Sequence, residues 1–221
     1  MRKLFVLTVL IFGVALLNAQ DKSAKEYKIE GADAYKAKDF QKGLTSFEQA
    51  IKLYEAEGKT DTSLYYNAAT CAYKVKEYQK ALDFFNQSID LNYKKCKAFL
   101  YKANTFKKLE RYEEMEAVCN EGISECPKYQ KKYDEILFNY YLKSGLKVYN
   151  NAAKMQSNAA QFVESEPDKY KTEMEKVKEE FKGSLPMLEK ARKINPDDET
   201  CKNALKQCYK ILEMSEKGAG F

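Results

Sequence analysis

Residues 65–92 read YYNAATCAYKVKEYQKALDFFNQSIDLN, and this stretch decides the fold. Small and large apolar residues alternate in it at the spacing of one face of an α-helix. Two helices with this pattern can approach closely, because the aromatic side chains of one fill the space beside the small residues of the other. The stretch therefore predicts two packed helices joined by a short turn.

The same pattern recurs along the chain. Aromatic residues stand at Tyr27, Tyr65, Phe99 and Tyr133, at intervals of 38, 34 and 34 residues. Further positions agree in the same register, among them Gly31, Ala69 and Ala103, then Phe40, Tyr78 and Tyr112, and finally Ile51, Ile89 and Ile123. A period near 34 residues is typical of helix–turn–helix repeats, so we expect stacked helix pairs.

These repeats resemble the tetratricopeptide repeat family. The first reads GADAYKAKDFQKGLTSFEQAIKL from residue 31, and the third reads FLYKANTFKKLERYEEMEAVCNEGISECP from residue 99. The third ends in Pro127, the family's closing proline, but it has Cys119 where an aromatic residue is usual, and no repeat has the common tryptophan. The resemblance implies an all-α fold, a right-handed superhelical solenoid of antiparallel helix pairs.

A fourth repeat is interrupted. The position held by Phe181 would fall at residue 146 in an unbroken repeat, so 35 residues are inserted. A heptad-like seam on two antiparallel helices runs through this region, at Leu142, Leu146, Tyr149, Ala153, Gln156, Ala160 and Val163, and then at Tyr170, Met174, Val177 and Phe181. We expect an extended helical hairpin whose return arm is kinked at Gly183 and Pro186. The pattern leaves open whether the hairpin projects beyond the stack or packs back against it.

These patterns divide the chain into six segments. The predicted boundaries are a signal peptide at 1–19, a first repeat at 24–57, a second at 62–95, a third at 96–129, a fourth with its hairpin at 130–198, and a capping helix at 199–216. A solenoid needs a polar final face to stay soluble, and the last helix is expected to supply it.

The chain begins with MRKLFVLTVLIFGVALLNA, residues 1–19. Two basic residues precede an uncharged apolar run, and Leu17-Asn18-Ala19 is a cleavage-type ending, as in a secretory signal peptide. The alternative is an uncleaved membrane anchor, but the run from Leu4 to Leu17 is shorter than the roughly 20 residues of a spanning helix. We therefore expect an exported protein, periplasmic or secreted, with a membrane-tethered form as the alternative.

Composition excludes several functional classes. The 221 residues are 44% hydrophobic and 32% charged, with 38 basic and 33 acidic residues, so a nucleic-acid partner is not expected. The absence of histidine excludes Ser-His, Cys-His and His-metal sites. No glycine-rich phosphate loop occurs either, so the sequence predicts no enzyme, no cofactor, no metal and, after signal removal, no membrane insertion.

The family resemblance supplies candidate binding residues, because partner peptides of such proteins usually lie along a concave groove lined by the first helix of each repeat. The positions carried over to this chain are Lys28, Tyr35, Lys36, Tyr66, Thr70, Tyr73, Lys74, Leu100, Asn104, Lys107, Lys108, Phe138 and Tyr141. Over all groove positions, eight lysines face one aspartate, which favours a protein partner with an acidic or carboxylate-bearing peptide. The alternative is that lysine is simply the default solvated residue of this chain.

The six cysteines offer one candidate disulfide. Cys119 and Cys126 are seven residues apart along a predicted helix, which is too far for a bridge, and so are Cys201 and Cys208. Cys96 begins a first helix and Cys126 ends the second helix of the same pair, so these two can meet. The alternative is that most of the six are small buried hydrophobes.

The sequence thus favours a non-catalytic scaffold or adaptor of the cell envelope that binds a protein partner in its concave groove. One alternative is a structural component that self-assembles as a homo-oligomer through the hairpin. A cysteine-based redox protein is a less favoured alternative, because the chain has no Cys-x-x-Cys motif.

Overall fold

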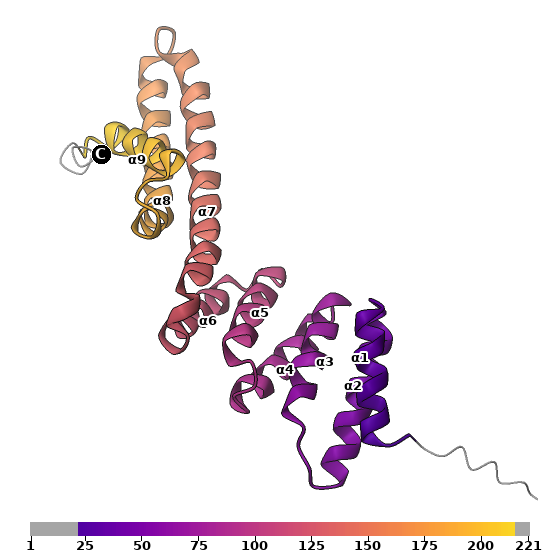
Figure 1. Ribbon diagram of the computed structural model, residues 1–221. Helices are drawn as coiled ribbons and strands as arrows, with labels where there is room; N and C mark the ends of the chain where they lie inside the picture. The colour runs from indigo at the N-terminus through magenta and orange to yellow at the C-terminus, as the bar shows by residue number, and fades with distance from the viewer. Residues whose placement is uncertain (1–21, 215–221) are drawn as a thin grey trace, which may run out of the picture.

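A computed structural model describes residues 22–214, which are helical with no strand among them (Figure 1). The helices are α1 (Ala24–Lys36), α2 (Phe40–Ala56), α3 (Thr62–Lys74), α4 (Tyr78–Asp90), α5 (Lys95–Lys108), α6 (Tyr112–Glu125), α7 (Gln130–Ala159), α8 (Pro167–Ile194) and α9 (Glu199–Ile211). The predicted all-α fold is confirmed. The predicted signal peptide lies outside the described residues.

Helices α1 to α6 form consecutive antiparallel pairs, and each pair packs on the next (Figure 1). Small residues allow this close approach. A Cβ atom added to Gly31 of α1 would lie 2.8 Å from the ring of Phe47 in α2, and one added to Gly43 would lie 3.0 Å from Sγ of Cys71 in α3. The alternation of small and large residues therefore sets both the packing within a pair and the packing between pairs.

The turn inside each pair has the same backbone conformation. Lys38, Lys76 and Glu110 each follow the end of the first helix with a positive φ, of 63°, 67° and 58°. The next residue donates its backbone N–H back into the helix, as Asp39 does to the carbonyl of Ala34 at 2.9 Å. This closes the helix end, and the chain then turns into the second helix of the pair.

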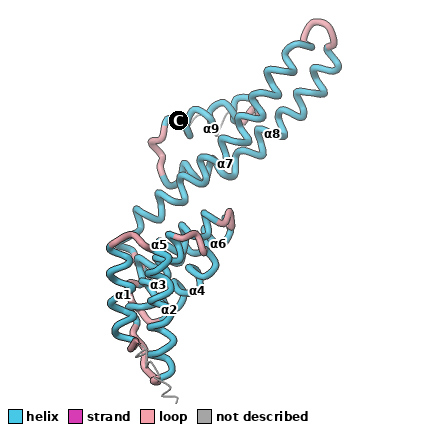
Figure 2. The backbone as a smooth tube through the Cα atoms, turned by 90° about the vertical axis from the view of Figure 1, so that its right-hand side faces the viewer, coloured by secondary structure: helices cyan, strands magenta, loops and turns pink. Residues whose placement is uncertain are grey.

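The long helices α7 and α8 form a hairpin that projects away from the three helix pairs (Figures 1 and 2). Its two arms contact each other along the predicted seam, where the rings of Tyr149 and Phe181 lie 5.5 Å apart. A Cβ atom on Gly145 would lie 2.7 Å from Cγ of Leu188, so glycine is required where the arms cross closely. The extended hairpin is confirmed, and Gly183 and Pro186 lie inside one unbroken helical span.

Helix α9 packs mainly against α8. Asp198 caps its first turn by accepting a hydrogen bond from the N–H of Cys201 at 2.8 Å, and Leu205 and Cys208 are buried beneath it. The predicted capping helix is confirmed. Within residues 22–214, no helix combines the length and the hydropathy needed to cross a membrane.

Candidate functional site

Helices α1, α3, α5 and the start of α7 lie next to one another along the stack. They are the first helices of their pairs and carry every candidate binding residue. We call the accessible part of α1, α3 and α5 the first-helix face and define it as Tyr35, Lys36, Tyr73, Lys74, Tyr101, Lys107 and Lys108.

The candidate residues differ in accessibility. The exposed ones are Tyr35, Lys36, Lys74, Lys107 and Lys108, and the half-buried ones are Lys28, Tyr73, Leu100, Asn104 and Phe138. Three are buried, with exposed fractions of 8% for Tyr66 and 4% each for Thr70 and Tyr141. The prediction that these three line an accessible groove is therefore wrong.

The burial of Tyr66 and Tyr141 has identifiable causes. The Tyr66 ring packs against Tyr101 of the next pair at 6.3 Å, and Nζ of Lys94 covers it at 4.6 Å. Tyr141 lies beneath Lys190, whose Nζ is 4.9 Å from the ring centroid. In each case the covering group comes from a neighbouring element, so these side chains stabilise the stack rather than meet a partner.

An aromatic cluster crosses the first-helix face. Tyr73 contacts Tyr101 at 5.6 Å and Tyr78 at 5.8 Å between ring centroids, and Tyr101 stacks on Phe85 at 5.5 Å. Tyr101 was not among the candidates, because it lies outside the family's groove positions. Its half-buried ring nevertheless joins α5 to α3, so the two helices share one amphipathic surface.

The charge of this face is one-sided on α3 and α5, whereas Lys36 of α1 is paired with Asp33 at 3.1 Å. Helix α3 ends in Lys74, helix α5 holds Lys95, Lys97, Lys102, Lys107 and Lys108, and neither helix contains an acidic residue. In the part of the chain that the structure describes, no carboxylate forms an ion pair with Lys74, Lys107 or Lys108. By contrast, Lys28 is paired with Asp61 and holds α1 to the loop before α3. The lysines without an ion-pair partner are thus concentrated on α3 and α5.

The start of α7 and the end of α8 border one hollow. A hollow there is lined by Gln130, Lys131, Asp134, Glu135, Phe138, Ile194 and Asn195. The fourth segment of the candidate groove is therefore bordered by the hairpin, and Phe138 faces this hollow instead of continuing the first-helix face.

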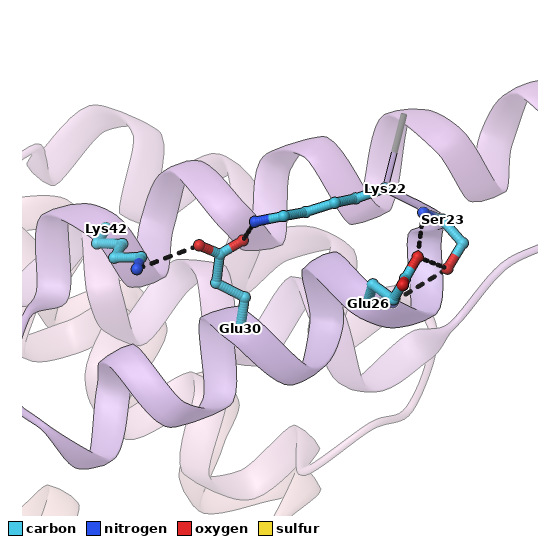
Figure 3. A network of polar contacts seen from close by, with 5 residues as sticks. All are labelled: Lys22, Ser23, Glu26, Glu30 and Lys42. Carbon is cyan, nitrogen blue, oxygen red and sulfur yellow. Dashed lines mark hydrogen bonds and ion pairs between the residues drawn. The ribbon is translucent and has the colours of Figure 1, made fainter. Parts of the chain in front are cut away.

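A polar network closes the N-terminal end of the stack (Figure 3). Glu30 of α1 accepts hydrogen bonds from Lys22 at 2.7 Å and forms an ion pair with Lys42 of α2 at 3.2 Å. The Lys22 hydrogen bond, followed by that of Lys42, holds the pKa of Glu30 below its ordinary value. Ser23 and Glu26 cap α1 reciprocally. This end therefore presents charges where a further repeat would otherwise stack.

Cys96 and Cys126 form a disulfide, with their Cα atoms 5.6 Å apart. It joins the start of α5 to the end of α6. The other four cysteines, Cys71, Cys119, Cys201 and Cys208, are free and buried. Burial raises the pKa of Cys71 and Cys119 to about 12, which is the opposite of what a reactive thiolate requires. Residues 22–214 also contain no cluster of acidic residues and cysteines that could hold a metal ion.

The free energy of unfolding should fall in alkaline solution because of these buried thiols. A thiol in the unfolded chain titrates at about pH 8.5, well below the folded pKa of Cys71 and Cys119. Below that pH both states keep the proton. Above it the unfolded state loses protons first, so stability declines by about 1.4 kcal/mol per thiol and pH unit until the folded pKa is reached. Urea denaturation from about pH 8 to about pH 11 measures how the free energy of unfolding changes with pH. Cys71→Ala should make this decline shallower by about 1.4 kcal/mol per pH unit, the contribution of one proton. A slope that does not change in this variant would contradict the assignment.

Several known proteins are similar to this chain. A family model described as tetratricopeptide repeat matches residues 29–94, whereas no curated protein matches the chain. A TPR repeats protein from Bacteroides fragilis NCTC 9343 is 23% identical, over 86% of this chain and 99% of that one, with a TM-score of 0.47. The TPR2AB domain of yeast Sti1 in its pHSP90 complex is 14% identical, over 88% and 86%, with a TM-score of 0.44. The family match thus spans most of α1 and all of α2, α3 and α4.

Proposed function

We propose that this chain is a non-catalytic scaffold outside the cytoplasm, and that its first-helix face binds an acidic segment of a protein partner. Tetratricopeptide repeat proteins are interaction modules in general, which supports the first part. The acidic nature of the partner is argued from the charges of this chain.

One observation carries the proposal: exposed lysines without ion-pair partners lie beside half-buried tyrosines. Lys74, Lys107 and Lys108 raise the local positive potential, and no acidic residue of α3 or α5 offsets it. Tyr73 and Tyr101 add contact area that can pack on apolar groups and also form hydrogen bonds. This combination suits a peptide with carboxylates next to apolar side chains.

Two features support a location outside the cytoplasm. Residues 1–19 have the pattern of a secretory signal peptide. The Cys96–Cys126 disulfide belongs to the kind of bond that persists in oxidising compartments and is rare in the cytosol. We therefore propose an exported protein, periplasmic or secreted.

The other two functions have less support. The hairpin seam is occupied within one chain, since Tyr149 packs on Phe181 and Gly145 on Leu188, so the seam does not offer a surface for self-assembly. The described free cysteines are buried with raised pKa values, which disfavours cysteine redox chemistry.

Site-specific photo-crosslinking in the native cell envelope tests the proposal. A photoreactive residue at Lys74 or Lys107 should capture a protein partner, whereas the same residue at Asn86, exposed on α4, should not. Combining the probe with Lys108→Glu should reduce capture, because the reversed charge repels an acidic segment. Equal capture from Asn86, or capture only of another copy of this chain, would overturn the proposal.

A further inference from the structure

The two arms of the hairpin differ in how their lysines are paired. In α8, five lysines lie close to a carboxylate, namely Lys169 with Glu166, Lys176 with Glu173, Lys178 with Glu213, Lys182 with Glu179 and Lys190 with Glu116. In α7, Lys143, Lys147 and Lys154 have no ion-pair partner within residues 22–214. Among the described residues, no carboxylate therefore lies within ion-pair distance of these three lysines.

The unpaired lysines of α7 share one side of the helix. They are spaced by four and seven residues, intervals that return to the same side of an α-helix. From residue 136 to residue 163, the sequence contains no acidic residue. We call this surface the arm face and define it as Lys143, Lys147, Asn150, Asn151 and Lys154, all of which are exposed.

The three lysines of the arm face lie on the side of α7 that is opposite its buried residues. Gly145, Ala152 and Ala159 are the buried residues of this part of α7, and they lie on the opposite side of the helix, toward α8. Figure 2 shows the hairpin extending beyond the helix pairs. Lys147, Asn150, Asn151 and Lys154 line a hollow together with Glu180 of α8, which accepts a hydrogen bond from Asn151 at 2.8 Å and forms no ion pair with these lysines.

We propose that the arm face binds an acidic polypeptide segment, at a site separate from the first-helix face. The three ammonium groups are about 6 Å and 10.5 Å apart along the helix axis, which matches carboxylates at the same intervals on an acidic helix. Asn150 carries donors and an acceptor that can bond the polar groups of such a segment.

Other anionic partners fit this surface less well. Duplex nucleic acid carries one charge per about 1.7 Å of its axis, far denser than three lysines along this arm. An anionic bilayer would meet the hairpin tip, where Glu164, Glu166 and Asp168 are exposed and acidic. The arm face itself contains no apolar residue for insertion.

The test uses a fluorescent, alanine-based helical peptide whose glutamates are spaced four and seven residues apart. Fluorescence anisotropy measures the Kd of this peptide for the full chain. Lys143→Glu, Lys147→Glu and Lys154→Glu together should raise the Kd by at least about tenfold. The matched control reverses three exposed lysines of α8, Lys171, Lys176 and Lys182, and should raise it by less than about threefold. A scrambled peptide of the same composition should bind the wild-type chain more weakly.

A charge swap completes the test, because a lysine peptide of the same spacing should bind the arm-face variant and not the wild type. Equal weakening by both triple variants would mean that net charge alone drives binding, and would overturn the proposal. It would also be overturned if the arm-face variant lost affinity only for phosphatidylglycerol vesicles. A double variant, Lys74→Glu with Lys107→Glu, separates the two sites. If this variant lost peptide binding and the arm-face variant did not, the arm site would be refuted and the binding role of the first-helix face would stand.

Discussion

Replacing Tyr133 by alanine should lower the free energy of unfolding by about 3 to 5 kcal/mol, the range for removing a large aromatic side chain from a core. Tyr133 is fully buried near the base of α7 and packs against α6 at Gly122, where an added Cβ atom would lie 2.5 Å from its Cζ atom. Its hydroxyl donates a hydrogen bond to the carbonyl of Cys96 in α5 at 3.1 Å. One side chain thus joins the hairpin to the third helix pair, and urea denaturation of Tyr133→Ala measures its contribution.

Two controls separate the packing of Tyr133 from its hydrogen bond. Tyr133→Phe keeps the ring and should cost only about 1 kcal/mol. Tyr170→Ala removes a tyrosine that is half-buried near the hairpin tip and should cost less than Tyr133→Ala, because less apolar surface becomes exposed. A loss below about 1 kcal/mol in Tyr133→Ala would contradict the role of this residue at the junction.

Reducing the Cys96–Cys126 disulfide should lower the free energy of unfolding by about 3 to 4 kcal/mol, because the bond closes a loop with a sequence separation of 30 residues. The open loop gives the unfolded chain more conformations, and α5 is no longer tied to the end of α6. The urea midpoint measured with and without a reductant shows the effect.

The double variant Cys96→Ala with Cys126→Ala is the matched control for reduction. It should be as unstable as the reduced wild type and insensitive to the reductant, since Cys71, Cys119, Cys201 and Cys208 are free. If the reductant shifted its midpoint as much as that of the wild type, the stabilisation would have another source.

The sequence allowed the helix pairs and the hairpin to be predicted because their determinants recur at fixed spacings. Gly31 and Phe47 meet within a single pair, so their spacing in the chain reports their contact directly. The contact between the two arms of the hairpin could be predicted in the same way, since Tyr149 and Phe181 belong to one repeating pattern.

The depth of the candidate binding residues could not be predicted in the same way. Tyr66 is buried because Tyr101 and Lys94 cover it, and Tyr141 because Lys190 returns along α8 from far along the chain. A groove position assigned from a family resemblance specifies a side of a helix but not what lies over it. Tyr101 is the opposite case: it lies outside the groove positions of the family, and only its contact with Tyr73 places it on the first-helix face.

The continuity of α7 makes the hairpin a lever. The helix runs unbroken for 30 residues, about 45 Å, and Tyr133 near its base is held between α6 and the carbonyl of Cys96. A turn of ~10° at this contact would carry the far end of α7 through about 7 Å. A small change in the packing of the third helix pair would therefore be amplified at the hairpin tip, because that pair sets the direction in which the whole arm points.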